Sequence, residues 1–157
     1  MSKHDEILDM AVHALTGLMN GQKQAKASDL FDEALDIAEK LYAKVEIKAA
    51  TAGASPRDEL MDMGIHALSA LLNSRQGAKL DDLLDESMAA GQALITRVDQ
   101  ELAKVGEDVG REEFLDVAVH VQTALLNARP QMSADALSEQ CVSVANELLA
   151  KMGADVG

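Results

Sequence analysis

The sequence has very few aromatic residues and no tryptophan, so large rings cannot fill its interior. Phe31, Tyr42 and Phe114 are the only phenylalanine and tyrosine residues. Apolar residues nevertheless make up 48% of the chain, which leaves Leu, Ala, Met, Val and Ile to build a core. Leu, Ala, Met, Glu, Gln and Lys favour helices, whereas the β-branched and aromatic residues that favour strands are sparse here. The composition therefore predicts an all-α fold.

Cysteine and long apolar runs are also scarce. The single cysteine, Cys141, has no partner for an internal disulfide, and it stands in an apolar helical run without His or Asp at a fixed spacing, so we expect an inert buried thiol. No apolar run approaches the roughly 18 to 20 residues that span a membrane. The first residues also lack the basic start and apolar stretch of a signal peptide. These features predict a cytoplasmic protein that does not enter a membrane.

Basic residues are outnumbered by acidic ones, 14 to 27, which gives a formal net charge of −13. Direct binding to nucleic acid is disfavoured, because Lys and Arg drive it by displacing counterions from phosphates. An acidic surface suits solubility, and it also suits a partner protein with a basic surface. We therefore expect a protein partner and no direct binding to nucleic acid.

The chain contains three copies of one pattern. A shift of 53 residues aligns 5–45 with 58–98 without a gap, and 17 of the 41 aligned residues are identical. A further shift of 54 residues aligns 58–98 with 112–152. Each copy consists of two apolar-periodic helical segments joined by a short polar connector, which predicts a helical hairpin. The predicted copies cover residues 4–48, 57–104 and 111–152.

A lone hairpin of this size buries too little apolar surface to be stable, so we expect all three to share one core. The sequence predicts a single domain over residues 1–157, with six helices packed as one compact bundle or a short α-solenoid. The first helix of each copy is apolar over more than half of its circumference, which predicts an inner layer. Ser28, Asp81 and Ser133 are the predicted N-caps of the second helices.

The narrow polar side of the first helix repeats the same residue types in all three copies. We call it the polar stripe, and its members are Glu6, Asp9, His13 and Asn20, then Glu59, Asp62, His66 and Asn73, then Glu113, Asp116, His120 and Asn127. Asp and His are four residues apart, so their side chains are neighbours on a helix and the carboxylate can accept a hydrogen bond from the imidazole. The asparagines stand at predicted helix ends, where a left-handed residue can close the helix.

Three interpretations of the polar stripe remain open. Acidic residues near the start of a helix and a histidine near its end stabilise the helix dipole, so duplication alone accounts for the stripe on structural grounds. The Glu, Asp and His side chains can instead form a repeated partner-binding face. Carboxylates and imidazoles can also hold zinc, iron or manganese, although neither Glu-x-x-His nor His-Glu-x-x-His occurs. We expect no metal or other cofactor, and keep a metal-binding protein as an alternative.

A second acidic surface is predicted at the start of the second helices. Its members are Asp29, Asp32 and Glu33 in the first copy, Asp81, Asp82, Asp85 and Glu86 in the second, and only Asp135 and Glu139 in the third. Carboxylates in such a strip can imitate phosphates, so an acidic nucleic-acid mimic that inhibits a host protein is a further alternative.

No enzyme motif is present: the sequence has no glycine-rich phosphate loop, no Gly-x-Ser-x-Gly elbow and no Cys-x-x-Cys pair. We therefore predict a non-enzymatic helical-repeat protein that presents an acidic surface for protein-protein interaction. The third copy is expected to expose Val117, Val119 and Val121, which is compatible with a homo-oligomer.

The segments HALTGLMN at residues 13–20 and DLFDEALDIAEKLYAKV at residues 29–45 resemble short helical-hairpin proteins of bacteriophages and prophages. Those proteins usually have no assigned function. The resemblance covers one repeat at a time, and it implies a bacterial or phage origin but no activity and no functional residues.

Overall fold

A computed structural model describes residues 2–51, 53, 55–105 and 110–156, and within these ranges it contains helices and no strand. The predicted all-α fold is confirmed. The elements are α1 (Lys3–Gly21), the 3-10 helix η1 (Ala27–Leu30), α2 (Phe31–Ala49), α3 (Arg57–Ser74), α4 (Leu80–Val105), α5 (Arg111–Ala128) and α6 (Ala134–Val156). None of these helices combines the length and the apolar character needed to cross a membrane.

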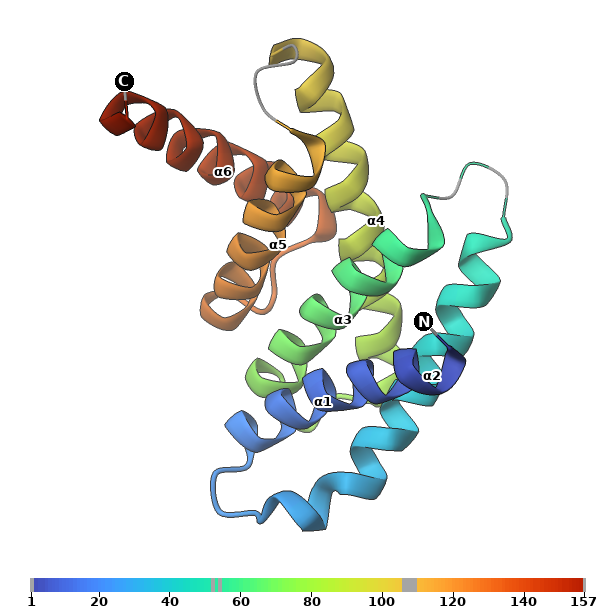
Figure 1. Ribbon diagram of the computed structural model, residues 1–157. Helices are drawn as coiled ribbons and strands as arrows, with labels where there is room; N and C mark the ends of the chain where they lie inside the picture. The colour runs from blue at the N-terminus through green and yellow to red at the C-terminus, as the bar shows by residue number, and fades with distance from the viewer. Residues whose placement is uncertain (1, 52, 54, 106–109, 157) are drawn as a thin grey trace.

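The six α-helices form three hairpins that stack in chain order. The helices α1 and α2 pack together, as do α3 and α4, and α5 and α6. The central helix α3 also contacts α1 on one side and α5 on the other, while α4 contacts α6. Between the described parts of the first and third hairpins there is no contact, and the two lie at opposite ends of the stack (Figure 1). The arrangement is therefore a short α-solenoid and not a closed bundle.

The predicted inner layer of first helices is found only in the middle of the stack, because at its first end α1 and α2 each bury five residues. The helix α3 is buried on both sides, and its ten buried residues are Leu60, Met61, Met63, Gly64, Ile65, Ala67, Leu68, Ala70, Leu71 and Leu72. The end helix α1 leaves Leu8, Val12 and Met19 exposed, because no described hairpin packs against this side of it. The expected exposure of Val119 is wrong: this side chain is 1% exposed, since α5 turns it into the core.

Only one of the three predicted N-caps on the second helices is confirmed. The Ser133 Oγ accepts a hydrogen bond from the Ala136 N–H at the start of α6. Ser28 instead lies inside η1, which buries Leu30 before α2 begins, and Asp81 lies in the first turn of α4. The first helix has a cap that the sequence analysis did not predict, a capping box in which Ser2 and Asp5 bond each other's backbone or side-chain groups.

The predicted left-handed asparagines are wrong. Apart from glycine, no described residue has a positive φ, and all three asparagines of the polar stripe lie within their helices. Each of these helices is instead followed by a residue with negative φ, which is neither helical nor extended and whose N–H still donates to a leucine carbonyl four positions earlier. These pairs are Gln22 to Leu18, Arg75 to Leu71 and Arg129 to Leu125.

Two glycines allow neighbouring helices to approach closely. A Cβ on Gly91 of α4 would lie 3.2 Å from the Gly64 nitrogen on α3. A Cβ on Gly17 of α1 would overlap the Ser69 carbonyl oxygen of α3 and lie 3.1 Å from the Leu72 Cβ. Gly17 therefore sets the distance between the first hairpin and the second.

We predict that Gly17→Ala destabilises the protein by about 1 to 3 kcal/mol, because the added methyl meets backbone that cannot move aside alone. Gly64→Ala is the matched control, since its Cβ would meet only the Met88 sulfur at 3.7 Å. Alanine at that helix position should stabilise by up to about 1 kcal/mol. Urea denaturation of the two variants measures both effects, and a Gly17→Ala variant as stable as Gly64→Ala would contradict the close approach.

Candidate functional site

The three histidines of the polar stripe form one row across the stack. The ring centroids of His13 and His66 are 5.0 Å apart, and those of His66 and His120 are 5.6 Å apart. The row exists because α3 packs against α1 on one side and α5 on the other, with the three equivalent histidines side by side. The repeat spacing alone did not show that these side chains meet.

Each histidine is oriented by its own helix. Its Nδ1 donates a hydrogen bond to the backbone carbonyl four residues earlier, which is an acceptor only, so in the neutral ring Nε2 is the open acceptor. The distances are 2.9 Å to Asp9 O, 2.8 Å to Asp62 O and 2.7 Å to Asp116 O. The predicted bond to the carboxylate is thus replaced by one to the backbone, and in the second and third copies the carboxylate oxygen lies farther away, at 3.4 and 3.8 Å. The aspartates remain exposed.

Two glutamates of the stripe, Glu6 and Glu59, form ion pairs that join one hairpin to the next. Arg57, at the start of α3, donates to Glu6 of α1 at 2.6 Å and to Glu46 of α2. Its guanidinium carbon also lies 5.2 Å from the ring centroid of Tyr42. The bond to Glu6, followed by that to Glu46, raises the pKa of Arg57 further above its usual range.

The second joint repeats the first. Arg111, at the start of α5, donates to both carboxylate oxygens of Glu59 and, at 2.7 Å, to Asp99 of α4. These bonds, with Glu59 first, raise the pKa of Arg111 as well. Glu113 of the third copy is exposed, because no described hairpin follows it. The sequence analysis missed both arginines, since the repeat alignment began one residue after them.

Two of the three asparagines also connect neighbouring copies. The Asn73 side-chain amide donates to the Asn127 side-chain oxygen at 2.8 Å, which links the ends of α3 and α5. Glu6, Glu59, Asn73 and Asn127 thus take part in contacts between copies, whereas the three aspartates of the stripe stay exposed.

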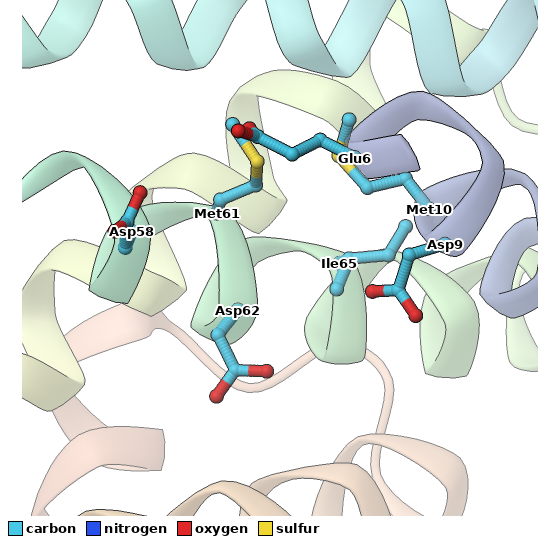
Figure 2. Close-up of a pocket in the computed structure, with 7 residues that line it drawn as sticks. All are labelled: Glu6, Asp9, Met10, Asp58, Met61, Asp62 and Ile65. Atoms are coloured by element: carbon cyan, nitrogen blue, oxygen red, sulfur yellow. The ribbon is translucent and has the colours of Figure 1, made fainter. Parts of the chain in front are cut away.

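An acidic groove of about 350 Å³ lies between α1 and α3 beside the histidine row. Its lining consists of four carboxylates and three apolar side chains: Glu6, Asp9, Asp58, Asp62, Met10, Met61 and Ile65. Figure 2 shows the carboxylates of Asp9 and Asp62 on one side of Ile65 and Glu6 with the two methionines on the other. The sequence analysis did not predict the apolar floor, because its residues belong to the packing face of each helix.

The metal-binding alternative finds no support in the described part of the chain. No group of three or more His, Cys, Asp or Glu residues there is arranged to hold a metal ion. The three imidazoles lie side by side in a row, whereas metal ligands converge on one point.

The acidic starts of the second helices are partly neutralised. Lys44 of α2 forms an ion pair with Asp85 of α4 at 2.9 Å, and Arg75 pairs with Glu86. Those contacts weaken a continuous phosphate-like strip, because two of its carboxylates already hold basic side chains. The aspartates of the polar stripe, by contrast, form no ion pair with Lys or Arg among the described residues.

Cys141 is fully buried, and burial raises the pKa of its thiol from 9.0 to about 12. Since the thiolate is the reactive form, a disulfide-exchange reagent at pH 8 should label native protein at least about a hundredfold more slowly than unfolded protein. Native labelling at the rate of an exposed thiol would contradict this burial.

The same shift predicts a stability change in alkali. In the unfolded chain the thiol loses its proton near pH 9, whereas in the folded chain it keeps the proton to about pH 12. The free energy of unfolding should therefore fall as pH rises through this window. Urea titrations should show a steeper fall for the natural chain than for Cys141→Ala, and parallel profiles would count against the buried thiol.

Comparison with protein-family models, curated proteins and solved structures finds no match to this chain. The resemblance to phage and prophage hairpin proteins stays a prediction.

Proposed function

We propose that this chain is a non-enzymatic helical-repeat protein whose polar stripe binds a basic segment of a partner protein. The observation that supports this most strongly is the groove between α1 and α3, where Asp9 and Asp62 stand over an apolar floor. We further expect it to act in the cytoplasm, where a reduced thiol such as Cys141 is stable.

The chemistry of the groove favours a long cationic side chain. Lys and Arg combine an apolar stem with a charged end, so the stem can cover Met61 and Ile65 while the end reaches Asp9 or Asp62. Both aspartates are exposed and keep their carboxylates free of the Arg57 contacts. A carboxylate in such a site forms stronger hydrogen bonds to a cationic donor than to a neutral one.

The histidine row extends this surface from the groove toward the third hairpin. Asp116 beside His120 repeats the arrangement of Asp62 beside His66, so a partner that runs across α1, α3 and α5 meets the same chemistry at intervals of one helix. Repeat proteins commonly bind extended partners in this manner. The row also supplies open imidazole nitrogens that accept hydrogen bonds from the partner.

The test compares two variants that remove the same charge from different surfaces. The stripe variant carries Asp9→Asn, Asp62→Asn and Asp116→Asn. The control carries Asp32→Asn, Asp82→Asn and Glu139→Gln, at exposed positions on the starts of the second helices. A displayed library of random peptides first selects binders to the natural chain, and calorimetry then measures their affinity for each variant.

We expect the selected peptides to be rich in Lys or Arg, and the stripe variant to bind them at least about tenfold more weakly, because each exposed ion pair contributes up to about 1 kcal/mol. The control should bind within about twofold of the natural chain. Equal losses in both variants would mean that only net charge matters. A larger loss in the control would shift the function to the second helices, as the nucleic-acid-mimic hypothesis requires.

A further inference from the structure

Apolar side chains at the first end of the stack are exposed, although the same positions are buried in the other two copies. We call this surface the N-face, and it consists of Leu8, Val12, Met19, Phe31 and Leu35, which are 39 to 55% exposed. Their equivalents in the second copy are at most 8% exposed: Met61, Ile65, Leu72, Leu84 and Met88. In the third copy they are at most 6% exposed: Leu115, Val119, Leu126, Ser138 and Val142. In those two copies the preceding hairpin packs against this side, and no described hairpin lies beside it in the first copy.

The opposite end of the stack shows the complementary pattern. We call this surface the C-face, and it consists of Val117, Val121, Ala124, Leu148 and Met152. Leu148 is 48% and Met152 61% exposed. Their equivalents in the second copy are at most 2% exposed: Met63, Ala67, Ala70, Leu94 and Val98. The hairpin that follows packs against this side of the first and second copies.

Inside the molecule, these two kinds of face meet each other. Gly17, on the C-face side of the first copy, lies so close to α3 that its Cβ would be 3.1 Å from Leu72, on the N-face side of the second. Met10 likewise shares the groove between α1 and α3 with Met61 and Ile65. Each joint is therefore heterologous, and the two ends of the stack are the two unpaired halves of one joint.

The polar part of the joint is present at the ends too. Arg57 and Arg111 stand on the N-face side of their hairpins and pair with Glu6 and Glu59 on the C-face side of the preceding ones. At the C-face end the equivalent carboxylate is Glu113, which is exposed. At the N-face end the equivalent of both arginines is His4, which is also exposed.

We propose that a second copy of this chain docks its N-face onto the C-face of the first and repeats the internal joint between the two molecules. The contact is heterologous, so it extends head to tail unless the ends are blocked. In this register His13 of the second copy lies beside His120 of the first and lengthens the histidine row. The proposal does not depend on the proposed function, because none of the apolar residues that form the two faces belongs to the polar stripe.

Each chain carries a net charge of −13, so two copies repel each other. Association should therefore be measured at high salt. Raising the salt concentration to about 1 M shortens the screening length to about 3 Å and should strengthen association. Sedimentation velocity of the natural chain should then show a mass that rises with concentration through dimers to longer species. A natural chain that stays monomeric under these conditions up to its solubility limit would overturn the proposal.

Three single substitutions separate a head-to-tail contact from other modes of association. Val12→Glu blocks the N-face, Leu148→Glu blocks the C-face, and Ile47→Glu is the control on a side chain 71% exposed that belongs to neither face. All three positions are at least 48% exposed, so each variant is expected to fold. Circular dichroism checks that they do.

We expect each blocked variant to be monomeric alone, because a buried unpaired charge should weaken the contact at least about a hundredfold. A mixture of the two should form a dimer of 1:1 composition and nothing larger, since one open N-face and one open C-face remain. Ile47→Glu should associate like the natural chain. Association of either blocked variant with itself, or no dimer in the mixture, would overturn the head-to-tail contact.

A gain of affinity tests the register of the joint. His4→Arg recreates the arginine of the two internal joints, and at about 0.15 M salt it should strengthen association about two- to fivefold, as expected for one partly exposed ion pair. Adding Glu113→Gln should remove this gain. An unchanged association constant in His4→Arg would contradict the proposed register.

Discussion

The joint between one hairpin and the next is the contact on which the rest of the structure depends. It packs two different apolar faces of the hairpin together and adds one arginine that binds carboxylates of the preceding helices. Gly17 brings α1 close to α3 at the first joint. Because both joints use equivalent positions, the first helices take the same register twice. The same contact between neighbouring hairpins is therefore formed twice along the stack.

The candidate site is a product of this register. No single hairpin contains the histidine row or the acidic groove, since each combines side chains from neighbouring first helices. Because of the joint, the acidic residues of the polar stripe differ in what they contact. Glu6 and Glu59 hold arginines between hairpins, whereas Asp9 and Asp62 stay open to a partner. Residues that recur together in a sequence therefore need not share a reason for recurring.

Local features of the fold were predictable from the sequence, and contacts between copies were not. The helix-forming composition predicted an all-α fold, and the apolar-periodic segments of the three copies predicted the helical hairpins. The open stack depends on which faces of different hairpins pack together. Apolar periodicity within one helix does not give this information. Ser28 failed as a cap because burial of Leu30 favours a 3-10 turn there. The histidines donate to backbone carbonyls and not to the aspartate carboxylates. This preference depends on the geometry of the helix, and the residue types alone do not indicate it.

Hydrogen exchange measured by mass spectrometry tests the stacked arrangement most directly. In a stack stabilised by nearest-neighbour joints, the central unit is held on both sides and the end units on one. We therefore expect the amides of α3 to exchange most slowly, with α1 and the far end of α6 exchanging faster. Equal protection of the three hairpins, or slower exchange in α1 than in α3, would show that they do not stabilise one another and would contradict the account.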